Sequence, residues 1–151
     1  MAPNPWTALL QALHSAMIDE LVERHPEPKP ELGLPARKNQ WEMPGSLDSA
    51  TEVLIVSVEI GEQRGIVSLV LSPLGQKTLG CAAQRLWEHV LSRAKVDFAR
   101  KGIQPQTGIP QVFNYQGAQI DLPSNLHQPT RLIWTPFRLA GEAIFLGIGL
   151  A

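Results

Sequence analysis

The chain has 151 residues, of which 44% are hydrophobic and 18% charged, and its formal net charge is −1. This length is typical of one domain and is enough to bury a sizeable core, so 1–151 is expected to be a single unit. Because Lys and Arg are scattered along the chain, the charge argues against nucleic acid or an anionic membrane as the main partner. The single cysteine, Cys81, excludes an internal disulfide and fits a reducing cytoplasm.

The first expected element is an amphipathic helix that begins at Pro5 and ends before His25. Asn4 is a good N-cap, and proline suits the first helical position. Apolar residues then recur at the three- and four-residue spacing of one buried helix face. They are Trp6, Leu10, Leu13, Met17 and Leu21.

Residues 26–50 hold five prolines and few apolar side chains, which predicts a surface excursion within the domain and not a linker. Trp41 and Met43 are expected to pin this segment to the protein, in one reading as an edge strand. Residues 51–60 and 65–72 are dense in β-branched residues around a Gly-containing turn. Since both faces of this hairpin are apolar, it should lie in the middle of a sheet with helices on at least one side.

After Pro73 ends the second strand, the apolar spacing predicts one long helix from Thr78 to Lys101. Gly102 provides its C-cap. Cys81 falls inside this helix and is expected to be a small buried residue and not a nucleophile. The inner stripe of the helix consists of Leu79, Ala83, Leu86, Val90, Ala94 and Phe98.

A short strand is expected at 111–115, and a last hairpin from the segments 130–137 and 143–151. Pro136 inside a strand belongs at an edge or a bulge. Gly147 and Gly149 alternate, which predicts a strand face bare enough for a helix to pack closely.

The order helix, Pro-rich stretch, hairpin thus occurs twice, in 5–72 and in 78–151. It predicts an α+β fold, an α/β sandwich whose central, largely antiparallel sheet is built from two hairpins plus extra strands, with two main helices. An internal pseudo-two-fold axis should relate the two halves, with Ile55 and Ile133 in equivalent environments.

Four segments of this layout are informative: the opening helix and its exit, the first hairpin with the following helix, the passage into a Pro-preceded strand, and the closing hairpin. In sequence they read ALLQALHSAMIDELVERHPEPKPELG, EVLIVSVEIGEQRGIVSLVLSPLGQKTLG, KGIQPQTGIPQVF and RLIWTPFRLAGEAIFLGIGLA. With these segments, nearly the whole chain resembles the chemotaxis phosphatases of the CheC/CheX type, and CheX most closely.

The resemblance implies hydrolysis of the aspartyl phosphate on a response regulator. The family uses a Glu and an Asn three residues apart on one helix face, where the acid pairs with the regulator's lysine and the amide orients a water. The metal and the phosphoryl group belong to the partner. This chain has no Glu-x-x-Asn in 78–101, and Arg85 and Glu88 stand at the matching positions. The resemblance therefore predicts a CheX-like domain that lacks the catalytic pair.

Four polar residues of this helix, Gln84, Arg85, Glu88 and His89, form the predicted partner-binding site, beside Trp87 as an aromatic anchor. In an alternative reading, Gln84 and Glu88 replace the lost amide and acid, in reversed order along the helix. The simplest reading is a solvated helix face with Trp87 in the core.

No motif points to a metal, a cofactor or a nucleotide. His14, His25, His89 and His127 have no metal-ligand spacing with one another or with Cys81. Neither a G-x-S-x-G elbow nor a phosphate-binding glycine loop is present.

These observations predict a catalytically silent, cytoplasmic CheX-like module of bacterial signalling that binds a response regulator or dimerises. The sheet edge beside the final hairpin is the expected place for dimerisation by sheet extension. Two alternatives stay open: an active aspartyl-phosphate phosphatase with a substituted acid and amide, and an unrelated small α+β domain.

Overall fold

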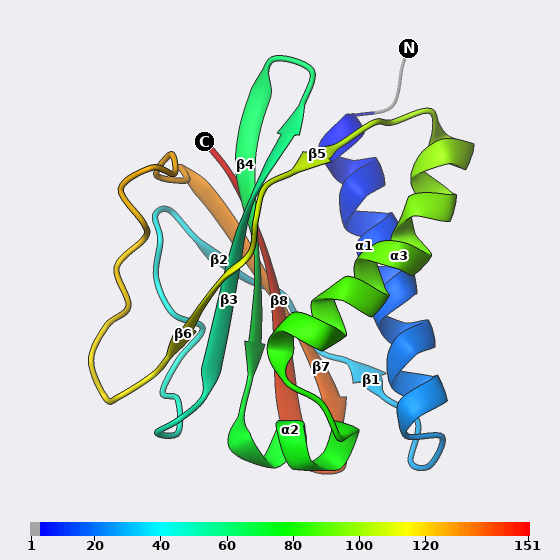
Figure 1. Ribbon diagram of the computed structural model, residues 1–151, viewed down its shortest axis with the longest axis vertical. Helices are drawn as coiled ribbons and strands as arrows, with labels where there is room; N and C mark the ends of the chain where they lie inside the picture. The colour runs from blue at the N-terminus through cyan, green and yellow to red at the C-terminus, as the bar shows by residue number, and fades with distance from the viewer. Residues whose placement is uncertain (1–3) are drawn as a thin grey trace.

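The computed structural model describes residues 4–151, in which one eight-stranded antiparallel sheet has two long helices on one face and loops on the other (Figure 1). The strand order is β1-β7-β8-β4-β3-β5, with β2 also paired to β7 and β6 to β3. The predicted α+β sandwich is therefore confirmed. The elements are α1 (Pro5–Arg24), β1 (Glu31–Leu32), β2 (Ala36–Lys38), β3 (Glu52–Ile60), β4 (Gln63–Leu71), α2 (Pro73–Leu79), α3 (Ala83–Lys101), β5 (Gln106–Thr107), β6 (Gln111–Asn114), β7 (Arg131–Leu139) and β8 (Glu142–Leu150).

Helix α1 begins and ends where the sequence predicts. The Asn4 side chain accepts a hydrogen bond from the backbone N–H of Trp6 at 2.9 Å, and Pro5 occupies the first turn. The helix is buried on two sides because it packs on the sheet and also runs antiparallel to α3. Leu9 is therefore fully buried, whereas the predicted Leu10 is half-buried.

The single long helix predicted for 78–101 is wrong, because the segment forms two helices. Pro73 ends β4 but also starts α2, with the Ser72 hydroxyl accepting from the N–H of Gly75 at 3.0 Å. Gly80 has a φ of 69°, a left-handed conformation that glycine adopts freely, and this conformation ends α2. Cys81 consequently lies in the break between the helices and not inside one.

Helix α3 has no capping side chain of its own, since its N-cap residue is Ala82. Instead, Glu52 at the start of β3 accepts a hydrogen bond from the N–H of Ala83 at 2.9 Å. This contact satisfies an otherwise orphaned donor and attaches the beginning of α3 to the sheet.

The internal repeat appears in the strand register. The cross-strand pair Glu52↔Leu71 of the first hairpin becomes the pair Arg131↔Leu150 of the second when 79 is added to each number. The two hairpins meet along β4 and β8, at the centre of the sheet. A pseudo-two-fold axis between these strands therefore relates β3 to β7 and β4 to β8.

The same register corrects one predicted equivalence. Ile55 corresponds to Trp134 and not to Ile133, and both Ile55 and Trp134 lie in the cluster on the loop side of the sheet. Because side chains alternate along a strand, Ile133 points to the helix side, where it is half-buried. The sequence alignment of the halves was one residue out of register, which exchanges the two faces of a strand.

The sheet separates two hydrophobic cores. The larger one lies between the sheet and the two long helices and contains most of the buried apolar residues. The smaller one lies under the loops on the opposite face and consists of Trp41, Met43, Val53, Ile55, Ile66, Val70, Leu132 and Trp134. No helix in residues 4–151 is long and apolar enough to cross a membrane.

Residues 26–50 form the predicted excursion, and both expected anchors are buried. Trp41 is 7% exposed, and its indole N–H donates to the carbonyl of Ile120 at 2.7 Å. Met43 lies in the same small core. The edge strand of this segment comes earlier than Trp41, as the short β1 and β2 along β7.

Pro136 lies within β7, which is paired on both sides. Its carbonyl accepts from the N–H of Gly33 at 2.8 Å, at the break between β1 and β2. Since the N–H and C=O of one strand residue point to the same side, the missing donor of Pro136 falls opposite this break. Pro136 is therefore not in an edge strand itself, and the edge next to it is interrupted between β1 and β2, where its missing N–H would point.

The bare strand face at Gly147 is filled, but not by a helix as predicted. Gly147 and Gly149 face the loop side, and a Cβ on Gly147 would lie 2.6 Å from the indole ring of Trp134. The ring, which is completely buried, takes the space that a side chain at position 147 would need.

We expect Gly147→Ala to destabilise the protein by about 2 kcal/mol, because the new methyl group displaces a buried ring. Urea denaturation of the variant measures this cost. In a Trp134→Phe background the same substitution should cost clearly less, since the smaller ring leaves room. An equal cost in both backgrounds would contradict the proposed clash.

Candidate partner-binding site on helix α3

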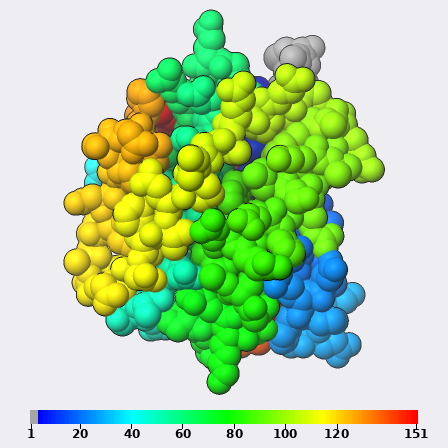
Figure 2. Space-filling view, viewed as in Figure 1, coloured from blue at the N-terminus to red at the C-terminus, as the bar shows by residue number. Residues whose placement is uncertain are grey.

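The outer side of α3 carries all four residues that the sequence predicts for partner binding. Gln84, Arg85, Glu88 and His89 are exposed, while their neighbours on the helix face the core. In Figure 2 the green and yellow-green atoms of α2 and α3 run across the face turned to the viewer. The structure therefore brings these four side chains together on one accessible surface.

The predicted aromatic anchor is absent from this surface. Trp87 is only 2% exposed and belongs to the core between the helices and the sheet. The broad apolar sector of α3 arises because the helix contacts both the sheet and α1. The reading of Trp87 as a core residue is thus correct.

Two further residues extend the surface, and the sequence reasoning missed them. Ser92 is exposed, and Val96 keeps 55% of its surface accessible. They follow Glu88 at intervals of four residues, which places all three on one side of the helix. That spacing was the available signal.

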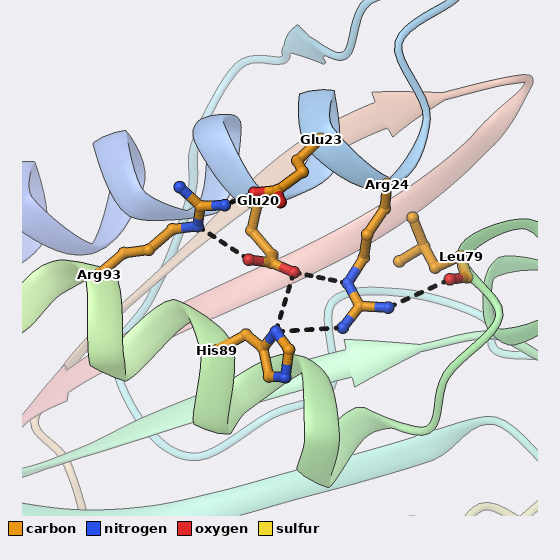
Figure 3. Close-up of polar contacts among 6 residues, drawn as sticks. All are labelled: Glu20, Glu23, Arg24, Leu79, His89 and Arg93. Atoms are coloured by element: carbon orange, nitrogen blue, oxygen red, sulfur yellow. Dashed lines mark hydrogen bonds and ion pairs between the residues drawn. The ribbon is translucent and has the colours of Figure 1, made fainter.

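A buried carboxylate lies directly behind the site (Figure 3). Glu20 of α1 is 4% exposed and accepts hydrogen bonds from the Nε–H of Arg24 at 2.6 Å and of Arg93 at 2.8 Å. The Nδ1 of His89 lies 3.3 Å from the same carboxylate. One side chain of α1 thus holds two residues of α3.

The cluster around Glu20 reaches further through its arginines. Arg24 donates to the carbonyl of Leu79 at 3.3 Å, at the end of α2, and Arg93 also pairs with Glu23. Glu20, Glu23, Glu88, His89, Ser92 and Arg93 line an open depression between α1 and α3. The predicted residue His89 therefore belongs to an inter-helix network that sequence spacing did not reveal.

The electrostatics of Glu20 favour its ionised form. Burial raises the pKa of the carboxyl group, but the hydrogen bonds and charges of Arg93 and Arg24 outweigh this effect and hold the pKa below its ordinary value. The carboxylate therefore remains charged, which keeps both arginines in place.

The other predicted residues are free to meet a partner. Within residues 4–151, the side chains of Gln84, Arg85 and Glu88 make no hydrogen bond or ion pair. Their charges are available for an incoming protein, and Gln84 and Glu88 lie one turn apart, with the amide nearer the start of the helix.

Other reactive side chains form no second site. Among residues 4–151 there is no group of three His, Cys, Asp or Glu side chains that could hold a metal ion. Burial raises the pKa of the half-buried Cys81 thiol, which disfavours the nucleophilic thiolate. Burial also lowers the pKa of His14, whose ring lies edge-on to Phe137.

Comparison with known proteins identifies the architecture. No family model matches the chain, and no curated protein matches it in sequence. Solved structures do match: a CheC-like superfamily protein from Shewanella sp. PV-4 has a TM-score of 0.68 and 15% identity, over 95% of this chain and 97% of that chain. The chain has a CheC/CheX-like fold.

Two further structures with the CheX-like fold cover almost the whole chain. The chemotaxis protein CheX from Desulfovibrio desulfuricans has a TM-score of 0.65 and 15% identity, over 95% of this chain and 99% of that one. CheX from Borrelia burgdorferi, solved as a CheX–CheY–BeF3–Mg²⁺ complex, has a TM-score of 0.57 and 13% identity, over 93% and 96%. The fold resemblance expected from the sequence is confirmed.

We expect Glu20→Gln to lower the free energy of unfolding by about 2 kcal/mol at neutral pH, because two arginines lose their anionic partner. Since the pKa of Glu20 is lower in the folded state, its contribution is complete above the ordinary value of about 4.5 and is lost as the pH falls through the folded value. Urea titrations in steps from neutral pH to well below pH 4.5 should show the gap to wild type closing in acid.

The matched control is Asp19→Asn, which removes an exposed carboxylate from the preceding position of α1. It should change the stability by no more than about 0.5 kcal/mol. The ion-pair explanation would be contradicted if the difference in free energy of unfolding between wild type and Glu20→Gln stayed constant down to the lowest pH measured.

Proposed function

We propose that the protein is a CheX-like signalling domain of the bacterial cytoplasm that binds a phosphorylated response regulator through α3 without hydrolysing its aspartyl phosphate. The observation that carries this proposal is the fold match to a CheX solved in complex with CheY. The exposed, unpaired Arg85 and Glu88 on α3 support it, because they offer charges to a partner at no cost in broken intramolecular contacts.

The contacts that Glu20 and Glu52 make to α3 favour a binding role for this helix. Arg93 and His89 are held from behind by Glu20, and the beginning of the helix is capped by Glu52. A surface fixed in this way loses little conformational freedom when a partner docks. Its exposed Val96 adds an apolar contact among the charges.

The residues of α3 argue against the phosphatase reaction. The helix contains no asparagine, and its one amide, Gln84, precedes the acid Glu88. The reaction implied by the resemblance has the acid first, so that the acid meets the regulator's lysine while the amide orients water. With the order reversed, the amide and the acid exchange places along the helix.

Binding is tested with the host's response regulator in its BeF3⁻-activated form. Calorimetry measures the affinity and the stoichiometry of the complex. We expect a 1:1 complex that Arg85→Glu and Glu88→Arg each weaken by about tenfold or more, through reversal of an unpaired charge in the interface. Lys77→Glu on α2, an exposed charge reversal outside the site, should change the affinity by less than about twofold. Equal effects of all three variants would contradict docking on α3.

The enzymatic alternative is tested by the decay of the phosphorylated regulator. We expect the same decay rate with and without this protein, because on α3 the amide Gln84 precedes the acid Glu88, the reverse of the required order. If decay is faster and Gln84→Ala and Glu88→Ala each remove about a hundredfold of the acceleration while the fold persists, the protein is instead a phosphatase with a substituted pair.

Self-association is the second part of the proposal, and the structure favours a different edge from the one named in the sequence analysis. The edge beside the final hairpin consists of β1, which carries Glu31, and β2, which carries Arg37 and Lys38. The opposite edge, β5 and β6, lies in an uncharged stretch, 103–120, with Ile109 88% exposed. Like charges disfavour pairing of β2 with β2 of a second copy, so we propose that a homodimer would form at the uncharged edge, β5 and β6.

Sedimentation analysis tests this edge. Asn114→Lys adds a positive charge to the short β6 of each copy, so a β6 pair brings two like charges close together and should weaken by about tenfold. Arg37→Gln at the other edge should leave it unchanged. The reverse pattern would move the interface to β1 and β2.

A further inference from the structure

A second charged surface lies at the sheet edge, apart from α3. Arg37 and Lys38 of β2 pair with Ile133 and Leu132 of β7, and Arg131 begins that strand. By strand alternation, Arg37 and Arg131 point to the helix side and Lys38 to the loop side. The three cations line one depression together with Asn39, the buried Leu132 and the half-buried Ile133.

These cations are largely without counter-charges. In the described part of the chain, the side chains of Arg37 and Arg131 take part in no hydrogen bond or ion pair. Lys38 lies 3.7 Å from the carboxylate of Glu42, which is itself 53% exposed. Such a surface pair contributes little stability, so this site keeps a surplus of positive charge in a chain of net charge −1.

The pseudo-two-fold axis provides an internal comparison. Since β3 corresponds to β7, the partners of these strands correspond as well, and Arg37 and Lys38 match Val112 and Phe113 of β6. The whole stretch 103–130 contains no Lys or Arg. The equivalent edge therefore folds without cations, which shows that this architecture does not require them.

We propose that the depression formed by Arg37, Lys38 and Arg131 binds an acidic segment of another protein. Two carboxylates would meet the arginines, and an apolar side chain would lie on Ile133 between them. Pairing of β2 with β2 of a second copy is disfavoured, because it brings the cations Arg37 and Lys38 of both copies together. Single-stranded nucleic acid lacks its stacking platform, since Trp41 and Trp134 are buried.

The probe is a fluorescein-labelled 12-residue peptide in which every second residue is glutamate and the others are leucine and serine. Its binding to the protein is measured by fluorescence anisotropy. We expect binding that weakens as salt rises and that the Arg37→Glu/Arg131→Glu double variant reduces by about tenfold or more. The matched control, Lys77→Glu/Lys95→Glu, makes the same change in net charge with exposed, unpaired lysines on α2 and α3. It should alter the affinity by less than about twofold.

Three results would overturn the proposal. The first is no binding by the wild-type protein at millimolar peptide. The second is an equal loss in both double variants, which would mean that binding follows net charge alone. The third is equal or tighter binding of a labelled 12-residue oligothymidylate, which would make the ligand a nucleic acid. In the first case, self-association of the Arg37→Gln/Arg131→Gln variant in sedimentation would assign the cations to protecting the edge.

Discussion

The pairing of β4 with β8 is the contact on which the rest of the structure depends. It joins the two hairpins along their inner strands, so that each half contributes two long strands to one sheet. At its centre Ser68 faces Gly147, and the Ser68 hydroxyl donates to the carbonyl of Leu54 at 2.7 Å. These small residues leave room for the Trp134 ring on the loop side, and the opposite side receives both helices.

The two long helices do not share the symmetry of the sheet, because one of them carries a buried acid that binds charged residues of both. Glu20 is a buried acid on α1, and the charges it attracts come from both helices. Its cost of burial is offset because two guanidinium groups hydrogen-bond to it, whereas an unpaired carboxylate there would be strongly destabilising. The Glu20 cluster thereby attaches α3 to α1, and Arg24 also reaches the carbonyl of Leu79, beside the break at Gly80. At the other end of the helix pair, the Lys101 ammonium donates to the Gln11 side chain at 3.2 Å.

The fold alone does not determine which reaction, if any, the protein performs, whereas the side chains on α3 limit the possibilities. A CheX-like frame presents a long helix, but acid–amide catalysis on that helix depends on the order and spacing of two residues. Here the free side chains on α3 are an amide, a cation and an acid, in that order along the helix. The cationic sheet edge at Arg37 and Arg131 is a separate surface, on the side of the sheet away from β3.

Helix and strand periodicity record which faces are buried, so the sequence predicts α1, the two long hairpins, the duplication and the exposure of Gln84, Arg85, Glu88 and His89. The tertiary structure was needed for the strand register, the break at Gly80 and the covering of Gly147 by Trp134. It alone also brought Glu20 to His89 and Arg93, which lie about seventy residues further along the chain. Such contacts depend on how two elements face each other, and local spacing along one element carries no information about its neighbour.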